Sequence, residues 1–153
     1  MQARCGDTLL LSLSQLDREH WELIAEESEF AGALEKGASR AELEMRLSRL
    51  IQAFQSHFQS EEGLMRLNGF PGLARHAAEH RKLIRQMQEL RDDLDSGVVK
   101  LCDTLAGFVR LWTEQHMTGA DARFTQFLQK NASKCELRVL SNLPEPDCNS
   151  SSL

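Results

Sequence analysis

Apolar side chains recur at three- and four-residue steps through four stretches of the sequence, and this periodicity restricts the possible folds more than any other feature. Such spacing aligns the apolar residues along one side of an α-helix. The four stretches cover about residues 17–36, 39–67, 71–94 and 98–128. No comparable run alternates apolar and polar residues at the two-residue step of a strand. The sequence therefore predicts an all-α protein.

Residues typical of helix ends separate these stretches. Gly37 follows the first, a Ser39-x-x-Glu42 capping box opens the second, and Asn68-Gly69 closes it. The predicted connections are short, which makes consecutive helices antiparallel neighbours. We therefore expect an up-down-up-down antiparallel four-helix bundle.

The length and composition fit one domain with short flanking segments. A chain of 153 residues, of which 41% are hydrophobic, can bury a core of its own. We expect the bundle to span residues 14–131, after an N-terminal arm of residues 1–13. Beyond Asn131 the composition shifts to Ser, Pro, Asn and Cys, so we expect residues 132–153 to form a flexible C-terminal tail.

The charge of the chain restricts the class of its partners. The formal net charge is -5, and no dense run of Lys and Arg occurs, which argues against a surface that follows phosphates or anionic lipid. No segment approaches the roughly 18 uninterrupted apolar residues of a membrane-spanning helix. We expect small molecules or proteins as partners, with no nucleic acid and no membrane.

The cysteines favour a reducing compartment, because none of the four is in a Cys-x-x-Cys pair. They are Cys5, Cys102, Cys135 and Cys148. A Cys135–Cys148 bridge across the tail remains open. The apolar run at residues 9–13 is short for a secretory signal and has no Ala-x-Ala-like cleavage site after it. We therefore expect a cytoplasmic protein.

All five histidines and two carboxylates fall on the predicted helices in a pattern that suits a transition metal. They are His20, His57, Glu61, His76, His80, His116 and Asp121. Residues four apart lie one turn apart on the same helix face, so His76 and His80 can aim at one inner point. The pair His57 and Glu61 has the same spacing. An isolated His-x-x-x-His pair is also common as a purely structural feature, but all seven together predict a metal site inside the bundle.

Two checks on helix geometry bear on this site. At ~1.5 Å per residue, counting from the predicted turns places the candidates of all four helices at similar heights. His116 and Asp121, however, are five residues apart, which leaves them poorly aligned on a regular helix. A local bulge would bring them together, and Gly119 makes that segment easier to deform. The alternative is that Asp121 is an exposed surface acid.

From Leu13 to Leu128 the sequence resembles the hemerythrin family, specifically the single-domain bacterial hemerythrins. All seven ligand positions of that family hold the expected residue type here. The matching signatures are Asp17-x-x-His20, His57-Phe-x-x-Glu61-Glu62-x-x-Met65, Pro71-x4-His76-x3-His80 and Trp112-x3-His116-x4-Asp121.

The resemblance implies a non-heme di-iron centre with an oxo or hydroxo bridge. One iron would bind three histidines and the other two, while both carboxylates would bridge the pair. The ligands would be His76, His80 and His116 for the first iron, His20 and His57 for the second, and Glu61 and Asp121 as bridges. The second iron would then keep one vacant position, where dioxygen would bind and take the proton of the hydroxo bridge.

Reversible binding of dioxygen, for storage, delivery or scavenging, is the leading functional hypothesis. Five imidazoles and only two carboxylates donate less negative charge than the ligands of carboxylate-rich di-iron enzymes, so we expect no catalytic residue. Two alternatives stay open. One is sensing of oxygen, redox state or nitric oxide through a partner protein, and the other is an enzyme that reduces peroxide or nitric oxide.

Five residues near the expected centre are candidates for lining the oxygen pocket. They are Leu23, Phe54, Phe58, Trp112 and Thr113. The four apolar residues also suit an ordinary core. Thr113 stands where related chains commonly have an aliphatic residue, and its hydroxyl would admit water. We therefore expect the ferrous centre to oxidise faster than with leucine at this position.

The sequence also predicts the surroundings or the role of four further residues. Glu27 lies two turns after His20 on the apparent inner face, where an unpaired carboxylate is costly, so it should either tilt to solvent or have a partner, and we expect it to tilt. We expect Glu62 to be solvated and Met65 to fill the core. We expect Asp17 to act in the first turn of its helix rather than as a hydrogen-bond acceptor for a ligand histidine.

Overall fold

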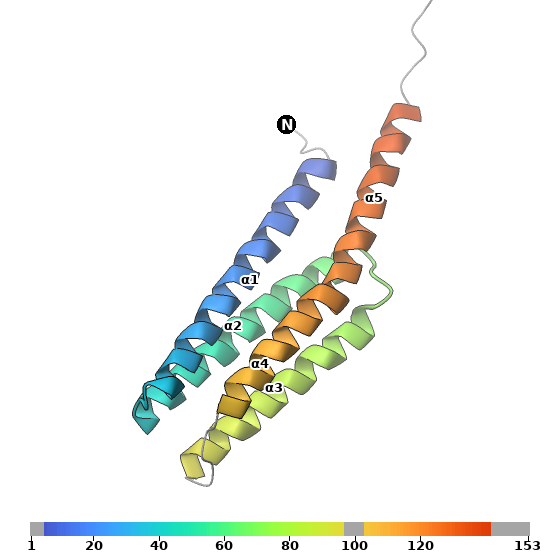
Figure 1. Ribbon diagram of the computed structural model, residues 1–153. Helices are drawn as coiled ribbons and strands as arrows, with labels where there is room; N and C mark the ends of the chain where they lie inside the picture. The colour runs from blue at the N-terminus through green and yellow to red at the C-terminus, as the bar shows by residue number, and fades with distance from the viewer. Residues whose placement is uncertain (1–4, 97–102, 142–153) are drawn as a thin grey trace, which may run out of the picture.

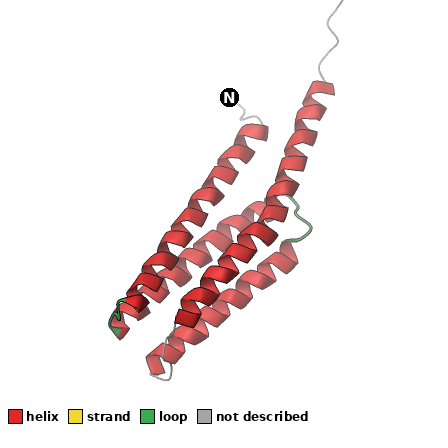
Figure 2. Cartoon of the chain, viewed as in Figure 1, coloured by secondary structure: helices red, strands yellow, loops and turns green. Residues whose placement is uncertain are grey.

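The chain folds into long helices, as the periodicity predicts. The computed structural model describes residues 5–96 and 103–141, and within them the side chains of residues 13–93 and 106–132. The elements are α1 (Cys5–Glu35), α2 (Arg40–Leu67), α3 (Leu73–Ser96), α4 (Asp103–His116), the short π-helix η1 (Met117–Asp121) and α5 (Ala122–Ser141). No strand occurs among the described residues (Figure 2). The all-α prediction is confirmed.

The described helices form four rods, because α4, η1 and α5 follow one another without a break and together make the fourth. α1 packs against α2, and α2 packs against α3. α1 also packs against α4 and α5, so the fourth rod lies beside the first (Figure 1). Successive rods run in opposite directions, which confirms the up-down-up-down bundle.

Two glycines end their helices in the way that their positions predict. Gly37 and Gly69 follow α1 and α2 with φ angles of 65° and 63°, in the left-handed region that glycine adopts without strain. Ser39 then caps α2, and its hydroxyl oxygen accepts a hydrogen bond from the backbone N–H of Glu42 at 3.3 Å. These short turns hold neighbouring rods close together.

The first and the last helix are both longer than the sequence suggested. α1 begins at Cys5 rather than Asp17, because Leu13 and Leu16 pack on the residues of α5. α5 continues past Asn131 to Ser141, since no glycine or proline interrupts residues 132–141. The helix bounds predicted for these ends were wrong.

Several expectations fall outside the described residues. These are the remainder of the tail at residues 142–153, and Cys102 and Cys148 with the possible Cys135–Cys148 bridge. The division into arm, domain and tail stays a prediction. In the described ranges, no helix has both the length and the apolar character needed to cross a bilayer.

The core consists of two apolar clusters, one on each side of a polar layer. The larger contains Leu23, Phe30, Leu47, Leu50, Ile51, Phe54, Phe58, Leu83, Met87 and Val109. The smaller contains Leu16, Met65, Phe124 and Leu128, so the expectation that Met65 fills the core is confirmed. Along α1, His20 stands between Leu16 of the smaller cluster and Leu23 of the larger one. The candidate ligands of the other rods lie in the same layer.

Candidate metal centre

Six of the seven candidate ligands are buried in this polar layer, and the seventh is half-buried. The six are His57, Glu61, His76, His80, His116 and Asp121, and the seventh is His20. Polar side chains this deep are costly unless other groups satisfy them. The structure thus gathers every predicted ligand at one height, two apolar clusters enclose them, and their ligation of metal stays a prediction.

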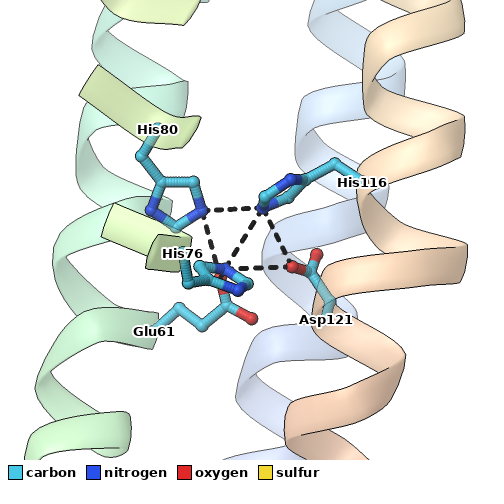
Figure 3. A group of neighbouring side chains, drawn as sticks. All are labelled: Glu61, His76, His80, His116 and Asp121. Atoms are coloured by element: carbon cyan, nitrogen blue, oxygen red, sulfur yellow. Dashed lines mark hydrogen bonds and ion pairs between the residues drawn. The ribbon is translucent and has the colours of Figure 1, made fainter. Parts of the chain in front are cut away.

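Five of these residues form one compact group, drawn in Figure 3. Each of Glu61, His76, His80, His116 and Asp121 offers one ligand atom, and these five atoms lie within 4.8 Å of one another. His116 Nε2 is 2.9 Å from His80 Nε2 and 3.1 Å from His76 Nε2. Three imidazoles therefore turn the same ring nitrogen toward one point.

The spacing of these atoms suits a shared cation. Two donor atoms ~2.1 Å from one ion and 90° apart lie about 3.0 Å from each other. Glu61 Oε2 is 3.0 Å from His76 Nε2, and Asp121 Oδ1 is 3.1 Å from His116 Nε2. Neighbouring donors of the group thus have the separations of an octahedral ligand set.

A second, smaller group contains His20, His57 and Asp121, with ligand atoms also within 4.8 Å of one another. The imidazole rings of His20 and His57 meet edge to face with their centroids 4.6 Å apart. Asp121 belongs to both groups, because its Oδ2 lies 3.2 Å from His20 Nε2 while its Oδ1 faces the larger group. One carboxylate therefore belongs to two adjacent groups of candidate ligands.

The π-helix η1 is what brings Asp121 onto the face of His116. In this segment the backbone N–H of Ala122 donates to the carbonyl of Met117, five residues earlier, rather than to the fourth. The wider turn rotates Asp121 to the inner side, where it is buried. The predicted bulge is confirmed, and the alternative of an exposed Asp121 is wrong.

Two buried oxygen atoms in this layer lack a hydrogen-bond donor. They are Glu61 Oε1 and Asp121 Oδ1. Asp121 Oδ1 lies within 3.3 Å of His76 Nε2 and 3.1 Å of His116 Nε2, but neither contact has hydrogen-bond geometry. An anionic oxygen left this way is destabilising unless a cation faces it. The donor set and the orphaned oxygens both fit a pair of bound metal ions.

A carboxylate supports the outer ring nitrogen of three candidate ligands, always from the preceding rod. Glu19 of α1 contacts His57 Nδ1 at 3.0 Å, and Glu62 of α2 contacts His80 Nδ1 at 2.9 Å. Glu79 of α3 lies 3.4 Å from His116 Nδ1. Such partners fix the tautomer and the ring orientation of a ligating histidine, which leaves Nε2 free for the metal.

These three acids mark where the sequence interpretation was incomplete. The expectation that Glu62 is solvated was wrong, and Glu19 and Glu79 were missed. Each of the three is the immediate neighbour of a candidate ligand in the sequence. An acid next to a ligand lies on the flank of its helix, where it reaches the ligand of the adjacent rod, and this adjacency could have revealed all three.

The charges of the layer shift several pKa values in the metal-free protein. Burial lowers the pKa of His76, but the carboxylates of Asp121 and Glu61 beside its ring outweigh burial and raise that pKa to about 9. Burial, together with the charge of the protonated His76 nearby, lowers the pKa of His80 to about 2. Burial raises the pKa of Glu61, whereas the imidazoles around Asp121 overcome burial and hold its pKa below the usual range. In the metal-free protein, the proton on His76 thus supplies positive charge beside the carboxylates, where a bound metal ion would otherwise supply it.

The apolar residues predicted to line an oxygen pocket lie against the two ligand groups. Trp112 stacks on the ring of His116 with centroids 4.3 Å apart, and Phe58 stacks on His80 at 3.6 Å. Leu23 and Phe54 belong to the larger apolar cluster, and Trp112 packs against that cluster. These contacts hold the imidazoles in place, while the role of the residues as a pocket stays a prediction.

The structure corrects two expectations about acidic residues on α1. Glu27 is half-buried and hydrogen-bonded to the hydroxyl of Thr113, so it has found a partner instead of tilting away. Asp17 lies well inside α1, which begins at Cys5, so a role in the first turn is wrong. Its side chain is exposed, and its charge adds to those that raise the pKa of His20 against burial.

Comparisons with known proteins agree with this geometry. Residues 11–128 match the family described as Hemerythrin HHE cation binding domain. A bacteriohemerythrin of Methylococcus capsulatus is 32% identical over 83 residues, which are 54% of this chain and 63% of that protein. One of Campylobacter jejuni is 24% identical over 119 residues, 78% of this chain and 90% of that protein. The crystal structure of wild-type hemerythrin has a TM-score of 0.71 at 27% identity, and the superposition covers 75% of this chain and 88% of that one.

Proposed function

We propose that this chain, which belongs to the hemerythrin HHE cation binding domain family, binds dioxygen reversibly at a di-iron centre held by the seven candidate ligands. The family implies oxygen binding at non-heme iron. The assignment of two irons to this chain, with a solvent-derived oxo or hydroxo bridge between them, is our proposal. Its support lies in the donor set and in the orphaned oxygens of Glu61 and Asp121.

The observation that carries the proposal is the inequality of the two groups. The larger offers three imidazoles with Glu61 and Asp121, and the smaller offers two imidazoles with Asp121. An octahedral ion in the larger group would find most of its positions filled by the chain, whereas one in the smaller group would keep room for a ligand. We therefore assign dioxygen to the side of His20 and His57. When bound as a ferrous pair, the ions would supply one electron each.

The protein contributes orientation and exclusion of water. Glu19, Glu62 and Glu79 hold the imidazoles in a single tautomer. Phe58 and Trp112 cover the layer from the side of the larger apolar cluster. Neutral imidazoles outnumber carboxylates, which favours binding over activation of oxygen. Hemerythrins are oxygen-binding proteins rather than enzymes, so we assign no catalytic residue.

The proposal is tested by loading the protein with iron and titrating it with oxygen. We expect about two irons per chain. In an anaerobic optical titration, oxygen should produce a ligand-to-iron charge-transfer band that disappears when oxygen is removed. The double variant His76→Ala/His80→Ala should lose iron, because the larger group would keep only one imidazole. Arg81→Ala, an exposed neighbour on the same helix, is the matched control and should load normally.

Three results would overturn the proposal. The first is full iron retention in the double variant, which would place the metal elsewhere. The second is a stoichiometry near one iron per chain. The third is an optical change that oxygen removal does not reverse while peroxide is turned over, since this would indicate an enzyme.

A further inference from the structure

A groove between α1 and α4 opens beside the ligand layer. Its volume is about 630 Å³, and its lining includes Ile24, Glu27 and Ser28 of α1 and Arg110, Thr113 and Glu114 of α4. Ile24, Ser28, Arg110 and Glu114 are exposed at its mouth, whereas Thr113 is buried with 4% of its surface accessible. Glu27 lies between the exposed mouth and the buried Thr113, because it is half-buried and hydrogen-bonded to Thr113.

The hydrogen bonds of Thr113 restrict where the protons of this pair can be. Thr113 Oγ1 is within hydrogen-bonding distance of Glu27 Oε1 and, at 3.0 Å, of the Val109 carbonyl oxygen. A hydroxyl group has only one proton to donate, and a carbonyl oxygen can only accept. Both contacts are satisfied together only when Glu27 carries a proton and donates to Thr113, which in turn donates to Val109. When Glu27 is ionised, the Thr113 proton turns to the carboxylate.

We propose that Glu27 and Thr113 form a proton gate between the α1–α4 groove and the iron pocket, with Glu27 holding the proton and the Thr113 hydroxyl passing it inward. The inference rests on the proposed function and concerns its main side reaction. Thr113 lies one turn before His116 on α4 and directly follows Trp112, which stacks on His116. The Thr113 hydroxyl thus stands about one helical turn from a candidate ligand and is hydrogen-bonded to a group of the groove.

The electrostatics of the groove are consistent with a proton on Glu27. Burial raises the pKa of the Glu27 carboxyl, and this effect outweighs the hydrogen bond from Thr113 and the charge of Arg110, which both lower it. The other charged groups that line the groove are Glu114 on α4 and Glu35 on α1. One cation and two anions therefore share the lining of the groove with Glu27.

The proton held by Glu27 is one of the two that reduction of dioxygen to hydrogen peroxide requires. Dioxygen that leaves as hydrogen peroxide has taken up two electrons, one from each iron(II), and two protons. A hydroxo bridge, as the resemblance to hemerythrins implies, would supply one proton. Glu27 provides the second through Thr113, and solvent in the groove then reprotonates Glu27. The gate thus sets how often bound oxygen escapes as peroxide and leaves both irons ferric.

The first experiment detects the proton itself. Infrared difference spectra of the iron-loaded protein, recorded over a pH series, should contain a carboxylic acid C=O band that titrates above the usual glutamate pKa of about 4.3. Glu27→Gln should abolish this band. Glu114→Gln removes a carboxylate from the same groove and should leave the band unchanged. A wild-type spectrum identical to that of Glu27→Gln would overturn the proposal.

The second experiment measures autoxidation of the oxygenated protein against pH. The wild-type rate should fall as the pH rises and Glu27 loses its proton. Glu27→Gln and Thr113→Val should lower the rate at least about tenfold at low pH and flatten the profile, a smaller effect than the roughly 100-fold of a fully isolated general acid because groove water can substitute. Thr113→Ser keeps the hydroxyl and should retain the wild-type profile, as should Glu114→Gln.

The outcomes separate this inference from the proposed function. If Glu27→Gln still binds oxygen reversibly and autoxidises like the wild type at every pH, the gate is disproved and oxygen binding stands. If the wild type binds no oxygen reversibly, the proposed function fails, and the infrared series still decides whether Glu27 holds a proton.

Discussion

At the scale of single residues, Asp121 and three supporting acids explain most of the site. Asp121 gives one oxygen to each group, so it joins the two groups of candidate ligands. The acids Glu19, Glu62 and Glu79 settle which nitrogen of each imidazole faces inward. Metal affinity should therefore depend on residues that never touch the metal.

We predict that Glu62→Ala lowers iron affinity by about 10- to 100-fold, because His80 would lose the acceptor that orients its ring. Competition with a chelator of known affinity measures the change. Glu89→Ala, which removes an exposed acid from α3, should bind iron as tightly as the wild type. Equal affinities for Glu62→Ala and the wild type would mean that packing against Phe58 alone orients His80.

Among single residues, the candidate ligands could be predicted from the sequence, whereas several of their contacts with other helices could not. Helix periodicity and the resemblance together named all seven candidate ligands, because each lies on the inner face of its own helix. The partners of Glu27 and Glu62 were not predicted, since both contacts join different rods. Periodicity within one helix carries no information about which side chain of another helix lies opposite.

At the scale of the elements, η1 is the one π-helix among the described residues, and it places Asp121 beside His116. Its five residues add a wide turn between α4 and α5, and without that turn Asp121 would point away from His116. The sequence predicted a distortion here from the spacing of two ligands. The extra turns of α1 were missed because they depend on the packing of Leu13 and Leu16 against α5, which periodicity within one helix does not reveal.

Gly119 provides the test of how η1 is maintained. The position has no positive φ, and a Cβ added there would meet no atom within 4 Å. We predict that Gly119→Ala raises the free energy of unfolding by about 0.5–1 kcal/mol, as expected for glycine inside a helix, and leaves the iron content unchanged. Chemical denaturation and iron analysis measure both quantities. Loss of iron from this variant would show that η1 needs the freedom of glycine.

At the scale of the whole molecule, metal binding, protonation and folding are one linked equilibrium. In the metal-free protein His76 keeps its proton well above the usual histidine range, because Asp121 and Glu61 face it. This proton stabilises the fold fully below the unfolded pKa of 6.5, and the stabilisation is lost as the pH rises to about 9. His80 adds nothing in this window, since its lowered pKa leaves it neutral in both states.

We predict that iron binding near neutral pH releases about one proton per chain from His76, with a further contribution from His20, in addition to the proton that water loses in forming the hydroxo bridge. Calorimetric titrations in two buffers of different ionisation enthalpy give the number. It should decrease as the pH approaches 9. Thermal unfolding of the metal-free protein should show the matching loss of stability over the same range. Iron binding without proton release would contradict the assigned charge state of His76.

The supporting acids also fix how far each rod can slide along its neighbour. α1 supplies Glu19 to α2, α2 supplies Glu62 to α3, and α3 supplies Glu79 to α4. Asp121 completes the circuit by returning to His20 of α1. A rod displaced by one turn, about 5.4 Å, would lose both the contact it gives and the one it receives. Apolar packing tolerates such slips more readily than paired polar groups do. These polar contacts therefore fix the position of each rod along the axis of the bundle.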